Sequence, residues 1–186
     1  SKSIIYSLGF SSNFYFHFSG LEYGDSESFL KPFLHTWSLS VEEQYYIIFP
    51  IIIILILKIS KKILAPILVF GFFLSLLFAH WSSIYQPSFS FYLFPTRGWE
   101  LLSGSLLSYL EIKLNGRKKN EILALLLPGV GIILIFFSIL FFDDRMIHPS
   151  IFTVIPVLGV SLVIWFSDKN DFFTKILSTR LFVGTG

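Results

Sequence analysis

A dense run of polar and ionisable side chains interrupts an otherwise apolar chain between His35 and Tyr46. It contains two adjacent carboxylates, Glu42 and Glu43. A carboxylate can take a proton or hold a polar substrate, and inside a membrane it requires a partner or water, so its presence there indicates function. In an ideal helix Glu42, Tyr45 and Tyr46 share one face, because they are three and four residues apart. We therefore expect this face to point into a helix bundle.

Part of the same run also has a structural explanation. Ser40 followed three residues later by Glu43 predicts a capping box at the start of a helix, which leaves Glu43 open to either a capping or a functional role. Glu42 is not needed for that cap, and its structural alternative is a hydrated carboxylate at the interface. Trp37 is typical of membrane-interface anchors. His35 by itself is more often a hydrogen-bonding structural residue.

A second polar cluster lies between Thr96 and Gly104, within another apolar stretch. Arg97 and Glu100 are three residues apart, so one helical face can hold them as an ion pair, which a low-dielectric bundle tolerates better than an isolated charge. Such a pair can serve a polar substrate, or it can simply lock two helices together. Gly98 and Gly104 predict the close approach of another helix.

The elements that must position these clusters are membrane-spanning helices. Of the 186 residues, 54% are hydrophobic and 14% are charged, whereas soluble domains average roughly 45–50% and 25%. The stretches 122–142 and 146–167 contain no Asp, Glu, Lys or Arg, and about 20 such residues suffice for a helix to cross the hydrocarbon core. The sequence predicts an all-α, polytopic transmembrane helix bundle with about six spans, at residues 3–19, 41–58, 63–81, 91–110, 122–142 and 152–167.

The loops between these spans alternate in charge. Every second loop is basic, including the two that hold Lys61 and Lys118, and the loops between them are acidic or uncharged. The positive-inside rule therefore places Lys61 and Lys118 in the cytoplasm, and Asp25 and Ser150 outside. Both polar clusters then lie at the outer ends of their spans, in one membrane layer where they can meet.

Composition also argues against several classes of function. The chain has no cysteine, which excludes disulfides, thiol catalysis and cysteine metal sites, and its four histidines are far apart in sequence, so we expect no metal site. The net charge of +2 is not concentrated on one face, and we expect no nucleic acid partner.

At its polar clusters the chain resembles the acyltransferase-3 family of polytopic membrane O-acyltransferases. The run from His35 to Tyr46, followed by Phe49-Pro50, is similar to the signature of that family. The segment Arg97-Gly98-Trp99-Glu100 is similar to its arginine-tryptophan-glutamate segment. Further stretches follow in the expected order along the whole chain, at residues 13–16, 156–159 and 182–184.

The resemblance implies an enzyme that moves an acyl group, expected to be acetyl, from acyl-coenzyme A to a hydroxyl of a cell-surface glycan or similar acceptor. It implies no bound cofactor and a place in the bacterial plasma membrane, with the lipid bilayer, acyl-CoA and the acceptor as partners. Members of the family typically begin with a helix that carries an arginine and a histidine thought to be catalytic. Residues 1–186 are therefore expected to be the central part of one membrane acyltransferase domain, with the catalytic base upstream of Ser1 and a further part after Gly186.

The residues and the resemblance together define a candidate site. Direct attack by the acceptor hydroxyl needs a base and donors that stabilise the developing oxyanion, but no nucleophilic serine. The candidates for catalysis are Glu42, Glu43 and Arg97. The candidates for substrate binding or support of the site are His35, Trp37, Ser38, Tyr46, Trp99 and Glu100.

Two alternatives from other classes remain at this level. In a transporter or flippase for a lipid-linked sugar, the same charged residues would line a translocation path. The chain shows no pair of corresponding hydrophobic segments of the kind that marks inverted repeats, which argues against this alternative. A purely structural membrane scaffold does not explain why the charges cluster so tightly.

Overall fold

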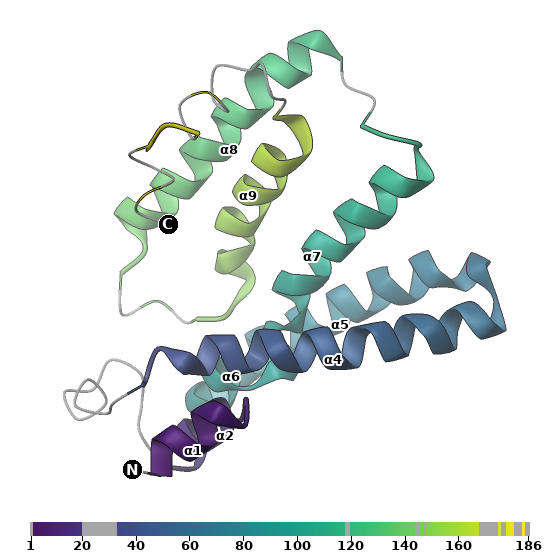
Figure 1. The fold of residues 1–186 in the computed structure, drawn as a ribbon. Coiled ribbons are helices and arrows are strands. Elements are labelled where there is room, and N and C mark those ends of the chain that lie inside the picture. The colour runs from purple at the N-terminus through teal and green to yellow at the C-terminus, as the bar shows by residue number, and fades with distance from the viewer. Residues whose placement is uncertain are drawn as a thin grey trace. The chain divides into compact units, whose positions relative to one another are not determined.

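The computed structural model describes residues 2–19, 33–117, 120–143, 146, 148–167, 175, 178–180 and 184 (Figure 1). In this part of the chain the regular structure is helical and includes no strand, which confirms the all-α prediction. The elements are α1 (Lys2–Leu8), α2 (Ser12–Phe18), α4 (Thr36–Ile59), η1 (Lys61–Ile63), α5 (Leu64–Tyr85), α6 (Pro87–Tyr92), α7 (Phe94–Lys113), α8 (Glu121–Phe141), η2 (Ile151–Thr153) and α9 (Val154–Phe166). They fall into two compact units, Ser1–Leu106 with Asp144–Thr153 and Leu107–Asp143 with Val154–Gly186.

Three helical segments are long and apolar enough to cross a membrane: Thr36–Ile59, Lys61–Tyr85 and Ile122–Phe141. They match three of the six predicted spans. Helix α7 has the length for a fourth, but it carries four charged residues. The apolar stretch Ile151–Phe166 is shorter. The membrane character is thus confirmed, and the count of six stays a prediction.

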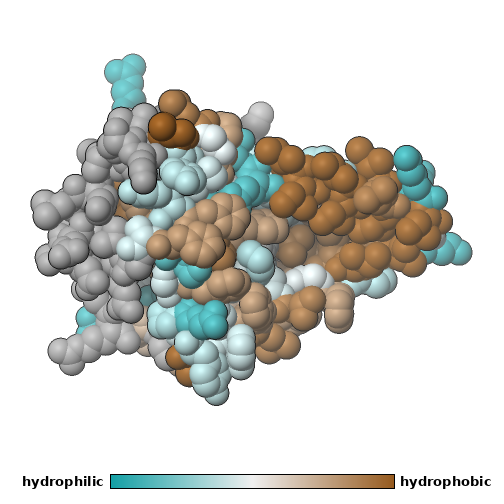
Figure 2. Space-filling view, turned by 90° about the horizontal axis from the view of Figure 1, so that it is seen from below, coloured by the Kyte–Doolittle hydropathy of each residue, from teal (hydrophilic) through white to brown (hydrophobic). Residues whose placement is uncertain are grey.

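Helices α4 and α5 form a hairpin that turns at η1 (Figure 1). Figure 2 shows a hydrophobic surface along this hairpin and a hydrophilic tip. Lys58 lies in the last turn of α4, and Lys61 and Lys62 belong to η1. Because large apolar side chains such as Ile51 and Phe70 are exposed along the hairpin, it suits a hydrocarbon environment rather than water.

The prediction of one helix over residues 3–19 is wrong, because α1 ends at Leu8 and α2 begins at Ser12. Phe10 has a φ of 49°, in the left-handed region that ends helices. The Ser11 amide donates to the Tyr6 carbonyl at 2.9 Å, and the Phe10 amide to the Ser7 carbonyl at 3.3 Å, which completes a Schellman motif. Each helix has seven residues, which is too short for either one to cross a bilayer by itself.

The two short helices are attached to α4 by uncharged hydrogen bonds. Ser12 and Ser40 are fully buried, with 2.7 Å between their Oγ atoms. Asn13 and Gln44 exchange two amide hydrogen bonds, of 3.0 and 3.3 Å. Beside this network Phe16 packs on Tyr92 of α6, so α2, α4 and α6 share one small core. This core fixes the first turns of α4.

The loop before α9 belongs to the same unit as α4 and α5. Ser83 near the end of α5 donates a hydrogen bond to the Pro149 carbonyl, and its Oγ lies 2.7 Å from that of Ser90 in α6. Ser150 is fully buried. Two loops that were both predicted to face outward are therefore in contact, while Asp25 and Lys118, used in the same topology prediction, lie outside the described residues.

In the second unit α8 packs along α9 through a close backbone contact. A Cβ atom on Gly131 would lie 2.5 Å from the Gly159 carbonyl oxygen, and one on Gly159 would lie 2.7 Å from the Gly131 carbonyl oxygen. The expectation that Gly104 serves such an approach is wrong for the described part, because nothing lies within 4 Å of its Cβ position. Gly98 is buried, but its Cβ position meets only side-chain atoms, the nearest at 3.5 Å.

Candidate functional site

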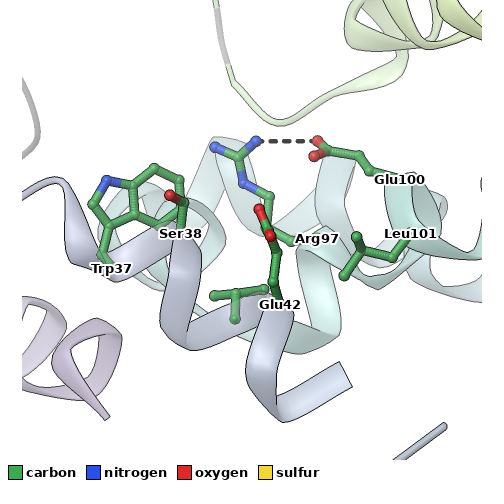
Figure 3. A pocket seen from close by; sticks show the side chains of 7 residues that line it. Trp37, Ser38, Glu42, Arg97, Glu100 and Leu101 are labelled. Atoms are coloured by element: carbon green, nitrogen blue, oxygen red, sulfur yellow. Dashed lines mark hydrogen bonds and ion pairs between the residues drawn. The ribbon is translucent and has the colours of Figure 1, made fainter. Parts of the chain in front are cut away.

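A pocket of about 150 Å³ lies between the first turns of α4 and of α7 (Figure 3). Both helices begin at the polar clusters, and residues of both clusters line this pocket, so the two clusters meet, as the sequence left possible. The side chains of Glu42 and Arg97 point into this pocket from the two helices (Figure 3). Its lining consists of Trp37, Ser38, Val41, Glu42, Arg97, Glu100 and Leu101.

The guanidinium of Arg97 has the most complete set of contacts in the pocket. Its Nη1 lies 3.0 Å from Glu100 Oε1, which confirms the predicted ion pair, and its Nε donates to the Phe91 carbonyl at 3.3 Å. Its Cζ lies 5.2 Å from the ring centroid of Trp37 and 4.9 Å from that of Phe91. With 17% of the side chain exposed, Arg97 is shielded from water but still open to the pocket. Its Nη2 makes no hydrogen bond to any residue that the structure describes.

The capping box predicted at Ser40 and Glu43 is wrong. Helix α4 begins at Thr36, with His35 as its N-cap residue, so Ser40 lies inside the helix. Its hydroxyl donates to the Thr36 carbonyl at 3.1 Å instead of capping a helix end. The reason is that the hydroxyl chain to α2 stabilises one more turn ahead of Ser40. Glu43 therefore has no cap to serve, and it does not line the pocket.

The face that was predicted to hold Glu42, Tyr45 and Tyr46 divides between two environments. Tyr45 is buried, and its hydroxyl lies 2.6 Å from Ser105 Oγ, which joins α4 to α7 next to the pocket. Tyr46 is 59% exposed and does not line the pocket. The helix turns Tyr46 away because burial of Tyr45 against α7 fixes the rotation of α4.

Two further candidate residues lie outside the pocket. His35 is exposed at the start of α4, and its ring centroid lies 6.4 Å from that of Phe33. Trp99 is fully buried, with its ring edge-to-face on Phe72 at 5.9 Å and its backbone amide donating to Ser75 Oγ at 3.0 Å. Trp99 thus packs α7 against α5 on the side of α7 that does not line the pocket.

Sequence reasoning missed two residues near Arg97. Phe91 was one of 23 phenylalanines, and no spacing distinguished it. His148 stands alone in a loop that had no motif. Burial lowers the pKa of His148, and the positive charge of Arg97 lowers it further. The loop held by Ser83 therefore brings an imidazole into the electrostatic range of Arg97.

The carboxylates and the guanidinium that line this pocket suit reactions in which an oxygen atom of a substrate is bound or becomes charged. Carboxylates can accept a hydrogen bond from a hydroxyl, and a guanidinium can stabilise an oxyanion, a carbonyl or a phosphate. Within the described part of the chain, no group of three His, Asp or Glu residues is arranged to hold a metal ion.

Comparison with known proteins gives the wider context of this site. A family model described as an acyltransferase domain matches residues 3–181. An uncharacterised protein of Haemophilus influenzae is 36% identical over 186 residues, which cover 91% of this chain and 72% of that protein. The peptidoglycan O-acetyltransferase OatA of Listeria monocytogenes is 30% identical over 191 residues, which cover 95% of this chain and 30% of the Listeria protein.

The chain thus spans less than a third of the Listeria protein, and no solved structure matches it. Its apolar helices mark an integral membrane protein. Both polar clusters, which meet in the pocket, lie within the matched residues. Because the match covers nearly the whole sequence, the chain belongs to the acyltransferase-3 family of acyltransferase domains.

Proposed function

We propose that this chain forms part of a membrane enzyme that transfers an acyl group, most simply acetyl, from acyl-CoA to a hydroxyl of a cell-envelope glycan or similar acceptor. The observation that carries the proposal is the position of Arg97 in a pocket shared with Glu42. Family membership supports the acyl transfer, and the peptidoglycan specificity in the name of the Listeria relative supports a glycan as acceptor.

In this proposal the chemistry of Arg97 is to stabilise negative charge on oxygen. Attack of a hydroxyl on a thioester carbonyl places charge on the carbonyl oxygen, and a fixed donor in a water-poor site lowers the barrier. Glu100 and the Phe91 carbonyl occupy Nη1 and Nε, so Nη2 and the remaining hydrogen of Nη1 are left for substrate oxygens. Two such hydrogens form the planar fork that recognises a carbonyl, carboxylate or phosphate group.

Glu42 has a different role in the proposal. Its carboxylate projects from α4 into the same pocket, where it can accept a hydrogen bond from the attacking hydroxyl or orient the catalytic base. The proposal does not give this role to the neighbouring Glu43, because Glu43 does not line the pocket. Of the two adjacent acids, Glu42 is therefore the proposed catalytic carboxylate.

The test is Arg97→Lys in the whole protein, expressed in membranes and supplied with labelled acetyl-CoA. Lysine keeps the charge but lacks the planar fork, so transfer of label into base-labile glycan esters should fall by roughly ten- to a hundredfold, as expected for a lost charged hydrogen bond of about 1.5–3 kcal/mol. The amount of folded protein in the membrane should stay the same.

The matched control is Arg117→Lys. Arg117 also pairs with a glutamate, Glu111, at 3.0 Å, and it donates to the Ile164 carbonyl near the end of α9, but it does not line the pocket. This variant should keep full activity. If Arg97→Lys is active, or if exchanging Arg97 and Glu100 restores activity, the pair is structural and the proposed function of Arg97 is wrong.

A further inference from the structure

We propose that Phe91 is a positioning residue for Arg97. The claim rests on the function proposed for Arg97 and adds a residue outside both polar clusters. Phe91 lies in α6, which is six residues long and separates α5 from α7. It contacts the guanidinium twice, through its backbone carbonyl and through its ring.

The ring of Phe91 packs against that of Trp37 with a tilt of 47° between the planes, and these two rings together are called the platform. Their centroids are 4.6 Å apart, and each lies about as far from the guanidinium carbon, at 4.9 and 5.2 Å. Three nearly equal distances place both rings on the same side of the guanidinium carbon, because rings on opposite sides of it would be much farther apart. Arg97 thus contacts both rings and also lines the pocket.

This platform supplies a restraint that the ion pair lacks. Glu100 is one turn away on the same helix and holds only Nη1, so the guanidinium could still rotate about that single bond. The Phe91 carbonyl fixes Nε at a second point. Contact with two rings then limits how far the plane of the group can turn, since a guanidinium over an aromatic face is attracted to it. A fixed plane is what two-pronged recognition of a substrate oxygen requires.

The position of Phe91 is in turn determined by its neighbours. Its ring packs edge-to-face on Tyr92 at 5.2 Å, and Tyr92 is fully buried against Phe16 of α2. The platform is therefore connected through Tyr92 to the small core that fixes the start of α4. Phe89, in the same short helix, packs instead on His17 and Phe78. It offers a matched phenylalanine that does not contact Arg97.

The experiment compares Phe91→Leu, Phe91→Tyr and Phe89→Leu in the whole protein. Membrane vesicles are supplied with labelled acetyl-CoA over a range of concentrations, and label in base-labile glycan esters is measured together with the thermal midpoint in detergent. Phe91→Leu should lower the maximal rate by roughly two- to thirtyfold, the range expected for one cation–π contact. Phe91→Tyr should restore it, and Phe89→Leu should keep the wild-type rate with a similar loss of thermal midpoint.

Three results would overturn the positioning role: a wild-type rate for Phe91→Leu, equal loss of rate in both leucine variants, or failure of Phe91→Tyr to restore activity. The proposed function is tested separately by Arg97→Lys. An inactive Arg97→Lys with a fully active Phe91→Leu would refute only the role of Phe91. An active Arg97→Lys would instead remove the function on which that role depends.

Discussion

Replacing Gly131 by alanine tests the closest helix contact in the second unit. The new methyl carbon would lie 2.5 Å from the carbonyl oxygen of Gly159 and 2.9 Å from Val163 Cγ2. Contact with a backbone oxygen cannot be relieved by a rotamer change, so α8 and α9 must move apart. Lipid gives helices little reason to associate except close packing, which makes this contact important for the pair.

The expected size of the effect follows from overpacking. Forcing one extra methyl group into a packed contact costs about 1–3 kcal/mol. For a chain of this size each kcal/mol lowers the thermal midpoint by about 2–4 °C, so Gly131→Ala should lower it by about 2–12 °C. The thermal midpoint is measured on purified protein in detergent, by following the loss of the helical circular dichroism signal or the change in intrinsic fluorescence on heating.

Gly104→Ala is the matched control, because it makes the same substitution inside a helix where the Cβ position is open. Alanine is the better helix former by about 1 kcal/mol, so this variant should be as stable as the wild type or more so. Equal midpoints for Gly131→Ala and the wild type would show that α8 and α9 do not approach this closely, and would refute the packing argument.

Three other outcomes are expected. Glu42→Gln should abolish acyl transfer with normal folding. Glu43→Gln should leave both activity and thermal midpoint unchanged, since Glu43 does not line the pocket of Glu42 and does not cap α4; equal inactivation would contradict this distinction. Gln86 and Lys61 are both exposed. On intact cells, a cysteine in place of Gln86 should react with an impermeant thiol reagent, and a cysteine in place of Lys61 should not. The opposite labelling pattern would show that the predicted topology is inverted. The lowered pKa of His148 means that the unfolded state binds its proton more readily, so stability should fall as pH drops below about 6.5. His148→Gln should reduce that fall, and an unchanged pH profile would argue against the assignment.

Ser150 illustrates why a topology test needs the structure. Charge alternation predicted that its loop faces outward, which made position 150 a natural reporter. The side chain is fully buried, because the neighbouring Pro149 carbonyl is bound by Ser83. A cysteine there would stay unlabelled on either side of the membrane, so Gln86 is the better choice.

Charge alternation and apolar length predicted one membrane layer for the two polar clusters, where they could meet; their contact in the pocket also depends on packing, such as the hydrogen bond between Tyr45 and Ser105. If basic loops fix the direction of each span, Glu42 and Arg97 are expected at the same level. The ion pair between Arg97 and Glu100 could also be predicted from the sequence, since a spacing of three residues places the two side chains together on any helix. These features follow from sequence order and helical geometry.

Other features depend on contacts that pattern alone does not specify. The break at Phe10 requires a left-handed backbone in a phenylalanine, and only the preceding Gly9 hinted at it. The start of α4 is set by hydrogen bonds from Ser12 of another helix, so the local capping signal at Ser40 was overruled. Phe91 acts partly through its carbonyl, which any residue would supply, and therefore left no mark in the sequence.

The contacts of Arg97 also bear on the order in which the protein is made. An arginine at a helix centre costs roughly 2.5–3.5 kcal/mol on insertion into the membrane, and less near the interface. Two of the residues that contact Arg97 precede it in the chain: Trp37 through its ring, and Phe91 through its ring and its carbonyl. The ion-pair partner, Glu100, follows within one helical turn. The ribosome therefore delivers every one of these partners before α8 is synthesised, and the charge can be neutralised while the chain is still growing.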